Sequence, residues 1–256
     1  MDINTMLLLC LFAFLAGFVD AIVGGGGLIQ LPAGIMLLPQ FPVATVMGSL
    51  KIPAFTGTAF AARQYLKKVS VHWQQVGLMC LLAFSAAFSG SQLLSVLSNQ
   101  YMKPVIFVVL IVVAIYTYSK KNFGQTVHKT LNKQQEFLYA ILISIVIGFY
   151  DGFIGPGAGS FFIMSFIGIL GYDFLKAGTY AKLINLSTNL GSIALFMLKG
   201  SILWSVALPM ALCNAVGGIL GAKLAIYKGN QFIRVFFLLV VMGTLLRFGY
   251  DIFLKD

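Results

Sequence analysis

Four ionisable residues, Asp20, Lys51, Asp151 and Lys182, lie inside apolar stretches of this 256-residue sequence. An ionisable side chain within a bilayer costs at least about 2.5–3.5 kcal/mol on insertion scales, so such a residue is a candidate for function by default. Two lysine ammonium groups that converge would bind one anion. The alternative is that each lysine neutralises the aspartate of its own half of the chain, Asp20 for Lys51 and Asp151 for Lys182.

Polar residues at helical spacing accompany both lysines. Thr58 lies seven residues after Lys51, while Asn185 and Asn189 lie three and seven residues after Lys182. Because residues at such spacings share one face of a helix, these side chains are expected beside the lysines. We therefore predict that Lys51, Thr58, Lys182, Asn185 and Asn189 contribute to binding a small anionic substrate.

Two glycine-rich segments, at 24–27 and 155–159, are candidates for backbone hydrogen-bond donors. Amide groups at a helix start carry partial positive charge and attract anions, and transporters with inverted repeats bind substrate at such discontinuous helices. The alternative is that these glycines only let helices pack closely. The glycines predicted to bind substrate are Gly24, Gly25, Gly26, Gly27, Gly155, Gly157 and Gly159.

Asp20 and Asp151 stand four residues before Gly24 and Gly155. A carboxylate in the membrane can relay protons, which would couple anion movement to a proton gradient. It can equally satisfy exposed backbone donors at the glycine-rich segment. Both aspartates are therefore predicted to serve either proton coupling or structure.

The sequence offers no grouping of His, Cys and carboxylate residues that would indicate a nucleophile with its base or a metal site. The three cysteines, Cys10, Cys80 and Cys213, lie in apolar runs without C-x-x-C spacing. No phosphate-binding loop motif occurs either, which argues against ATP-driven transport by this chain alone. We expect no enzyme, no cofactor and no metal site.

The composition places these residues in a membrane. Apolar residues make up 59% of the chain and charged residues only 9%, against about 25% in a soluble domain, so a cytosolic enzyme is excluded. The continuous apolar character of the runs favours transmembrane helices over strands. Ten such runs fall at about 6–23, 28–38, 42–66, 71–97, 102–119, 136–154, 159–170, 174–197, 202–226 and 231–250.

The runs at 28–38 and 159–170 are too short to cross a bilayer comfortably, since a spanning helix needs about 20 residues. Each follows a glycine-rich segment, so each is predicted to be a half-helix that begins at a break within the membrane. Whether these half-helices span or re-enter is left open by the sequence.

An internal repeat relates the two halves of the chain. Residues 131 positions apart are repeatedly of the same type, including Asp20 and Asp151, Lys51 and Lys182, and the two tryptophans. Chance matches in an apolar sequence would mainly pair leucines, whereas these pair residue types that are scarce here. The two tryptophans are Trp73 and Trp204, and further matches are Gly17 with Gly148, Phe18 with Phe149, Gly24 with Gly155, Gly26 with Gly157, and Gly90 with Gly221.

We predict a first transmembrane repeat at 1–118, a cytoplasmic basic linker at 119–135 and a second transmembrane repeat at 136–256. An odd number of about five segments per repeat inverts the second repeat relative to the first, as in many secondary transporters. This topology places eleven Lys and Arg residues on the linker side and four on the other, which predicts termini outside the cytoplasm. The net charge of +10 is thus assigned to topology and not to nucleic-acid binding.

Small residues four positions apart, at Ala86 and Gly90 and again at Gly217 and Gly221, permit close helix crossing. The crossing is expected either within the protein or at the interface of a homodimer. The predicted partners of the chain are a small anionic substrate and the lipid bilayer. If the small residues pack between two copies of the chain, a second copy is a further partner.

The segment G-F-V-D-A-I-V-G-G-G-G-L-I-Q-L-P at 17–32 and its counterpart G-F-Y-D-G-F-I-G-P-G-A-G-S at 148–160 resemble the TauE/SafE family of sulfite exporters, also called TSUP permeases. The resemblance covers nearly the whole chain. It implies a secondary transporter of sulfite, sulfonates, thiosulfate or other small organic anions in the bacterial plasma membrane. The second segment departs from an all-glycine run at Pro156 and Ala158.

Together these features predict an all-α polytopic membrane protein of two inverted repeats that moves a small anion by alternating access. The anion is expected to be sulfur-containing or a carboxylate, and its movement to be coupled to protons if Asp20 or Asp151 carries one. The alternatives are an anion channel, a membrane-embedded enzyme and a non-transporting scaffold.

Overall fold

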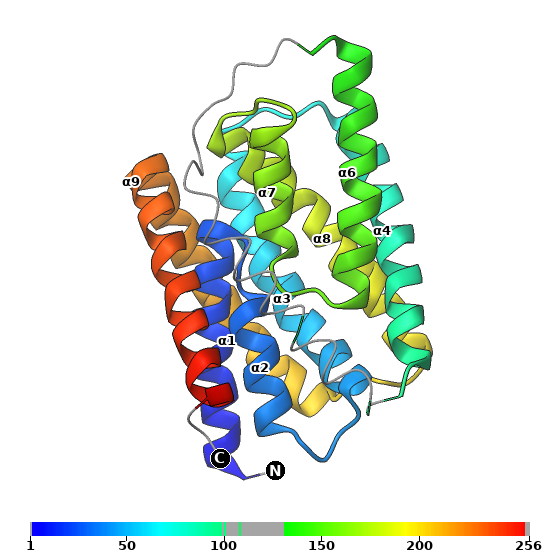
Figure 1. The fold of residues 1–256 in the computed structure, drawn as a ribbon, viewed down its shortest axis with the longest axis vertical. Helices are drawn as coiled ribbons and strands as arrows, with labels where there is room; N and C mark the ends of the chain where they lie inside the picture. Colours follow the sequence, from blue (N-terminus) through cyan, green and yellow to red (C-terminus); the bar gives the residue numbers. More distant parts are fainter. Residues whose placement is uncertain (1, 99, 101–107, 109–130, 254–256) are drawn as a thin grey trace.

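A computed structural model describes residues 2–98, 100, 108 and 131–253, with side chains up to Lys228, and within these residues every regular element is a helix (Figure 1). Most of the predicted run at 102–119 and most of the linker at 119–135 lie outside the described residues. The helices are α1 (Ile3–Val23), α2 (Gly27–Leu37), α3 (Val43–Leu66), α4 (Trp73–Val96), α6 (Lys133–Phe153), α7 (Ala158–Gly168), α8 (Phe174–Leu198) and α9 (Trp204–Phe253).

Five described helical segments are long and apolar enough to cross a membrane: Ile3–Val23, Trp73–Val96, Lys133–Phe153, Phe174–Leu198 and Trp204–Lys228. The prediction of an all-α polytopic membrane protein is therefore confirmed. Helix α3 has 24 residues, which is a similar length, but it carries Lys51 and Arg63. Its polar residues Ser49, Lys51 and Thr58 are buried, whereas Arg63, near its end, is exposed.

Local sequence signals set several helix ends. Gly24 adopts a left-handed conformation with φ 76° and ends α1, a conformation that glycine reaches without the steric cost of a Cβ atom. Asn132 and Gln135 form a reciprocal capping box at the start of α6, and the Asp173 side chain accepts a hydrogen bond from the Lys176 N–H at the start of α8. Such caps satisfy amide groups that the helix itself leaves unpaired.

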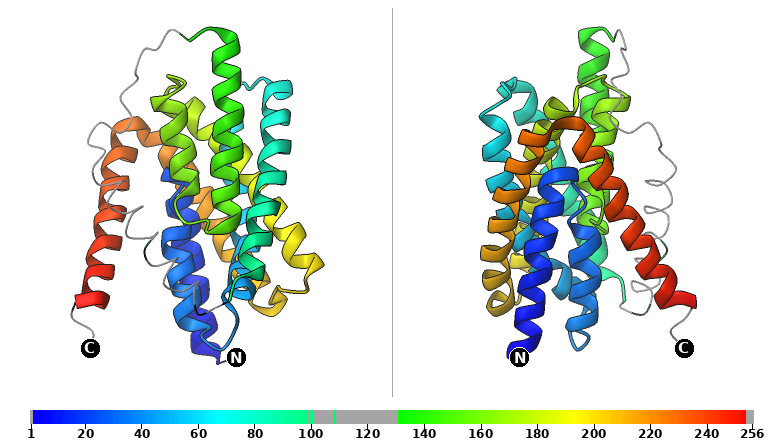
Figure 2. Two further views of the ribbon diagram at one scale, coloured as in Figure 1. Left: turned by 45° about the vertical axis from the view of Figure 1, so that its right-hand side comes forward. Right: turned by 90° about the vertical axis from the view of Figure 1, so that its left-hand side faces the viewer.

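The two short helices return toward the end of the molecule from which the preceding long helix came. In Figures 1 and 2, α2 runs back toward the end where α1 begins, and α7 runs back toward the end where α6 begins. Each has 11 residues, or about 16 Å of helix, roughly half the 30 Å hydrocarbon core. The helix pairs α1–α2 and α6–α7 therefore form hairpins with one long and one short arm.

Helix boundaries follow the 131-position repeat. Shifting Gly27–Leu37 by this offset gives the bounds of α7, Ala158–Gly168, and the starts of α3 and α4 map onto those of α8 and α9. Figure 1 shows α1 and α6 running in opposite directions, as an inverted repeat requires. The two-fold relation itself stays a prediction.

The two halves interlock through their helices. The most extensive contacts pair α1 with α9 and α4 with α6, followed by α3 with α9 and α4 with α8. Each of these contacts joins a helix of the first half to a helix of the second. The 131-position offset relates the α1–α9 contact to the α4–α6 contact, and the α3–α9 contact to the α4–α8 contact. A side chain on one half is therefore placed to reach the other half at the centre.

Glycines at helix crossings allow this close contact. A Cβ atom on Gly90 in α4 would lie 2.2 Å from the Phe149 carbonyl oxygen in α6, and one on Gly221 in α9 would lie 2.3 Å from the Phe18 carbonyl oxygen in α1. The predicted small-residue crossings thus occur within the chain. The homodimer stays a prediction.

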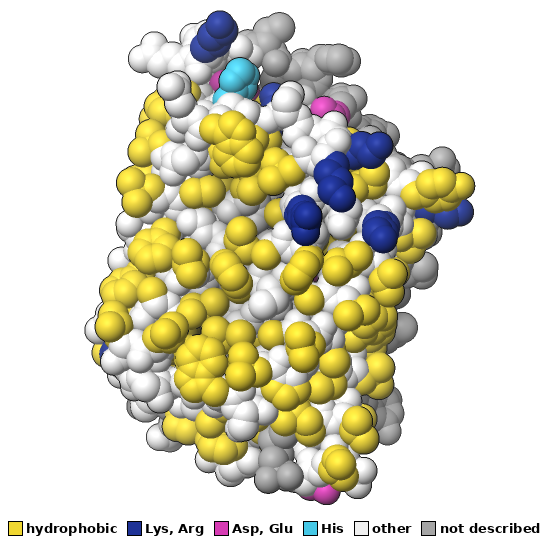
Figure 3. Space-filling model, turned by 180° about the vertical axis from the view of Figure 1, so that it is seen from behind, with side chains coloured by type: hydrophobic (Ala, Val, Ile, Leu, Met, Phe, Trp, Pro, Cys, Tyr) yellow, Lys and Arg dark blue, Asp and Glu magenta, His cyan; other side chains and the backbone are white. Residues whose placement is uncertain are grey.

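Basic side chains gather toward one end of the face shown in Figure 3, beyond a broad belt of hydrophobic side chains. The loop between α3 and α4, which carries Lys67 and Lys68, lies at the same end as the start of α6 (Figure 1). This distribution agrees with the topology predicted from the positive charges. Which end faces the cytoplasm stays a prediction.

Candidate functional site

A cavity of about 70 Å³ lies where the two hairpins meet α3 and α8. A water molecule needs at least about 10–15 Å³ of such space, so the cavity has room for several waters or for a small anion. Ten of the residues predicted from the sequence line it: Asp20, Gly24, Gly27, Lys51, Asp151, Gly155, Gly157, Gly159, Asn185 and Asn189. The other four, Gly25, Gly26, Thr58 and Lys182, are not among its lining residues.

The glycine-rich breaks of the two halves touch each other at this cavity. The Ser160 N–H donates to the Gly24 carbonyl oxygen at 3.1 Å, and a Cβ atom on Gly24 would lie only 2.3 Å from the carbonyl carbon of Gly159. A Cβ atom on Gly27 would likewise approach Pro156 Cα to 3.0 Å. Only residues without side chains let the two backbone segments come this close, so close packing accounts for part of the glycine pattern.

Both short helices begin at the cavity. Their first-turn amides cannot find partners within the helix, and several bond instead to nearby carbonyl groups, such as the Leu28 N–H to Gly25 and the Phe161 N–H to Gly157. The N–H groups of Gly27 and Gly159 have no acceptor among the described residues. Both of these glycines line the cavity, so the partial positive charge of two helix starts is directed at it.

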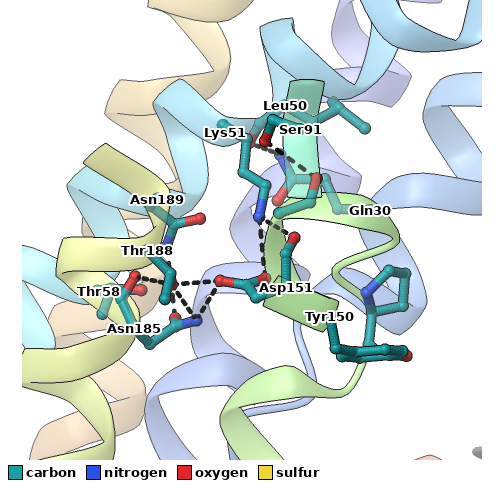
Figure 4. Close-up of polar contacts among 12 residues, drawn as sticks. Gln30, Leu50, Lys51, Thr58, Ser91, Tyr150, Asp151, Asn185, Thr188 and Asn189 are labelled. Atoms are coloured by element: carbon teal, nitrogen blue, oxygen red, sulfur yellow. Dashed lines mark hydrogen bonds and ion pairs between the residues drawn. The ribbon is translucent and has the colours of Figure 1, made fainter. Parts of the chain in front are cut away.

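Lys51 reaches across to the other half of the chain. Its Nζ atom donates to the Asp151 carboxylate oxygen Oδ1 at 2.9 Å and to the Asp151 carbonyl oxygen at 2.8 Å. The side chains of this ion pair are only 8% and 4% exposed. The alternative that Lys51 neutralises Asp20 is therefore wrong in this structure, because the fold brings the Lys51 side chain of α3 within ion-pair distance of Asp151, near the end of α6 (Figure 4).

The remaining carboxylate oxygen of Asp151 accepts hydrogen bonds from α8. Asn185 Nδ2 donates to Oδ2 at 3.1 Å, and the Thr188 hydroxyl donates to the same oxygen. Asn189 Nδ2 in turn donates to Asn185 Oδ1 at 3.4 Å. Figure 4 shows these side chains of α8 directed toward Asp151 on one side and Lys51 directed toward it on the other.

Lys182 makes the matching contact in the opposite direction, but only to the backbone. Its Nζ atom donates to the Asp20 carbonyl oxygen at 2.7 Å and lies 5.4 Å from the centre of the Tyr65 ring. Described residues provide no carboxylate within ion-pair distance of Lys182. The alternative that it neutralises Asp151, the aspartate of its own half, is therefore also wrong here.

The Asp20 carboxylate holds the first glycine-rich break. Oδ1 accepts from the Gly26 N–H at 3.3 Å, and Oδ2 accepts from the Thr58 hydroxyl at 3.2 Å. The two aspartates thus differ in their partners, since Asp151 meets an ammonium group while Asp20 meets an amide and a hydroxyl. The predicted convergence of two lysines is not observed, because only Lys51 lines the cavity.

Sequence reasoning did not single out Gln30, Thr188 and Asn214. Gln30 lines the cavity and is held by Asn214, whose Nδ2 donates to Gln30 Oε1 at 3.1 Å. Thr188 lies three residues after Asn185, so helical spacing alone would have included it. Asn214 is a polar residue inside an apolar run, the same signal that drew attention to the two lysines.

Among the described residues, no group of three or more His, Cys, Asp or Glu side chains lies close enough to hold a metal ion. The site therefore offers a lysine, carboxylates, carboxamides and backbone amides. Groups of this kind bind and release an ion without a covalent step.

Comparison with known proteins shows the family of this chain. The family model of the sulfite exporter TauE/SafE matches residues 9–248. The chain belongs to the TauE/SafE family. No solved structure shows significant similarity to it.

Curated relatives match this chain over almost its full length. A "probable membrane transporter protein" of Haemophilus influenzae is 33% identical over 98% of this chain and 98% of its own length. The "probable membrane transporter protein ORF9" of Sinorhizobium sp. is 32% identical over 98% and 95%, and YfcA of Escherichia coli K12, with the same description, is 29% identical over 97% and 92%. Family membership and these names indicate a membrane transporter rather than an enzyme. Together with the membrane-spanning helices, they support a multi-pass protein of the bacterial inner membrane.

Proposed function

We propose that this TauE/SafE protein is a secondary transporter of a small anion, such as sulfite, a sulfonate or another sulfur-containing or organic anion. The observation that carries the proposal is the cavity itself, at which Lys51 meets the N–H groups of Gly27 and Gly159, for which the described part of the chain provides no acceptor. A positive side chain and two helix starts offer donors and positive charge from three directions, which suits an ion with several acceptor oxygens.

Alternating access fits the placement of this cavity. The hairpins α1–α2 and α6–α7 bring one glycine-rich break from each half to the same place. Rocking of one repeat against the other would then open the cavity to each side of the membrane in turn. Energy for accumulation would come from a coupled ion, for which a carboxylate at the cavity provides a proton site.

A transport assay in proteoliposomes tests the proposal. Purified protein is reconstituted, and the uptake of radiolabelled sulfite, methanesulfonate and acetate is measured in exchange for the same unlabelled anion inside the vesicles. We expect saturable exchange of at least one of these anions by the parent protein. Lys51→Ala should reduce the exchange by tenfold or more, since about 1.4 kcal/mol of lost binding is a factor of ten.

Lys199→Ala provides the matched control. Lys199 is exposed and contacts Ser95 at the end of α4, so its removal should leave exchange at the parent rate. Exchange by Lys51→Ala at the parent rate would refute the role of Lys51. Flux that neither saturates nor shows exchange would favour the anion channel, and no movement of any of these anions would favour a scaffold.

A further inference from the structure

We propose that Asp151 takes up a proton when the anion binds, so that one proton crosses the membrane with each monovalent anion. This inference rests on the proposed function and deepens it, because it names the coupling residue and the stoichiometry. Its basis is that the cation at the cavity, Lys51, already has a carboxylate partner.

Lys51 cannot pair with an incoming anion without sharing its positive charge between that anion and Asp151. Two of the three ammonium protons of Lys51 are already donated to the carboxylate and the carbonyl oxygen of Asp151. An anion that enters therefore shares this ammonium group with a carboxylate. The two negative charges compete for one positive charge.

The competition between the anion and the Asp151 carboxylate for Lys51 is decided by the charge balance of the buried site. The Lys51–Asp151 pair is neutral and its side chains are almost fully buried. Adding a monovalent anion alone would leave one uncompensated negative charge away from water, which is strongly unfavourable. A proton on the Asp151 carboxylate restores neutrality, because the site then holds the Lys51 ammonium, a neutral carboxylic acid and the anion.

Asp20 is less suited to this role because its carboxylate has a structural task. Its oxygens accept hydrogen bonds from the Gly26 N–H and from the Thr58 hydroxyl. Its protonation would weaken the contact that holds the first glycine-rich break. It would also release no cation, since Lys182 bonds to the Asp20 carbonyl group and not to the carboxylate.

The groups around Asp151 allow this carboxylate to gain and lose a proton during the transport cycle. Lys51 approaches from α3, Tyr150 lies beside it on α6, and Asp20 lines the same cavity from α1. On α8, Lys182 is directed at Asp20, and the donors to Asp151 are the neutral side chains of Asn185 and Thr188. Neither α7 nor the part of α4 near Asp151 contributes a charged group.

Methanesulfonate is the appropriate probe, because it stays ionised throughout the working pH range and cannot cross the vesicle membrane as a neutral acid. With the outside more acidic, the parent protein should accumulate it roughly tenfold per pH unit at equilibrium, the ratio set by one proton per anion. A potassium diffusion potential set with valinomycin should leave uptake unchanged, because the cycle moves no net charge. If only sulfite is exchanged, sulfite replaces methanesulfonate at an acidic pH at which the monovalent hydrogen sulfite ion predominates, and protein-free vesicles give the baseline.

Asp151→Asn should lose the accumulation driven by the pH gradient, retain anion exchange and become sensitive to membrane potential. Its lysine no longer has a negative partner, so the empty site carries a positive charge that the anion neutralises. Asp20→Asn is the matched control and should keep accumulation driven by the pH gradient, even if its rate falls. If Asp151→Asn does not exchange, binding of methanesulfonate to the purified proteins replaces transport, and its dependence on pH should be present in the parent and absent in the variant.

The outcomes separate the coupling from the proposed function. Exchange by the parent protein without any effect of the pH gradient would refute the coupling and leave the transporter standing. Accumulation by Asp151→Asn that equals the parent's, or its loss only in Asp20→Asn, would also refute the assignment. Absence of any anion exchange by the parent would remove the proposed function and this inference with it.

Discussion

Lys51 and Asp151 should be energetically coupled although they lie 100 residues apart in different halves of the chain. Lys51→Met would leave the Asp151 carboxylate buried with only Asn185 and Thr188 as side-chain donors. Removing one partner of a buried ion pair costs about 3–5 kcal/mol, because the other charge stays desolvated. We expect Lys51→Met to lower the free energy of unfolding by this amount.

The double variant measures the interaction itself. When Lys51→Met is combined with Asp151→Asn, no unpaired charge remains at this contact, so the double variant should be more stable than the sum of the single losses predicts. Residues within one ion-pair network show coupling energies of about 0.5–3 kcal/mol. The burial of this pair places the expected value near the upper limit, at about 2–3 kcal/mol.

The assay is equilibrium unfolding in mixed micelles at increasing SDS fraction, followed by far-ultraviolet circular dichroism. Lys51→Met combined with Asp20→Asn is the control cycle, because no hydrogen bond or ion pair joins these two side chains in the structure. Its coupling should stay below about 1 kcal/mol, as for residues without shared partners. Equal coupling in both cycles, or larger coupling to Asp20, would refute pairing between the halves.

Two further predictions concern the glycine-rich breaks and the loop after α7. Gly24→Ala should prevent stable folding, because its Cβ would lie 2.3 Å from the Gly159 backbone at a φ of +76°. Gly25→Ala, whose Cβ would have its nearest contact at 3.7 Å, is the control and should give as much monodisperse protein as the parent. Equal yields of monodisperse protein from the two variants would contradict this packing. Burial and the hydrogen bond to Glu136 raise the pKa of the Tyr172 hydroxyl, which lies in the loop after α7. The neutral hydroxyl therefore contributes fully to stability below about pH 10, the ordinary pKa of tyrosine in an unfolded chain. This contribution is lost as the pH rises above that value, because the unfolded chain then loses the proton more readily than the folded protein. Thermal unfolding between pH 9 and 11 should therefore show a steeper loss for the parent than for Tyr172→Phe, and parallel curves would count against the role of Tyr172.

Much of the site could be predicted because its residues are unusual in an apolar chain. Lys51, Asp151 and Asn185 stand out as polar residues that a membrane protein retains at a cost, and all three line the cavity. The glycine-rich breaks are equally visible, since helices rarely contain such runs. The repeat of 131 positions then indicates that whatever occurs in one half has a counterpart in the other.

Partners could not be predicted in the same way. Helical spacing identifies residues on one face of one helix, so it finds Asn185 beside Lys182 but says nothing about the helix that faces them. The assumption that charges pair within a half failed for this reason, because α3 and α8 each extend toward the opposite half. Gln30 escaped notice because its importance depends on Asn214, which lies 184 residues away.

The sequence alone specifies a helical membrane protein and predicts a duplicated plan, because hydrophobicity, helix length and residue identity are properties of single segments. Three features are visible only in the folded molecule: the short helices turn back, the two glycine-rich breaks touch, and Lys51 meets Asp151. In a bilayer each helix satisfies its own backbone hydrogen bonds, so many apolar faces are nearly equivalent as neighbours. The choice among them depends on close contacts between small residues and on a few buried polar groups, which exist only once the helices are assembled.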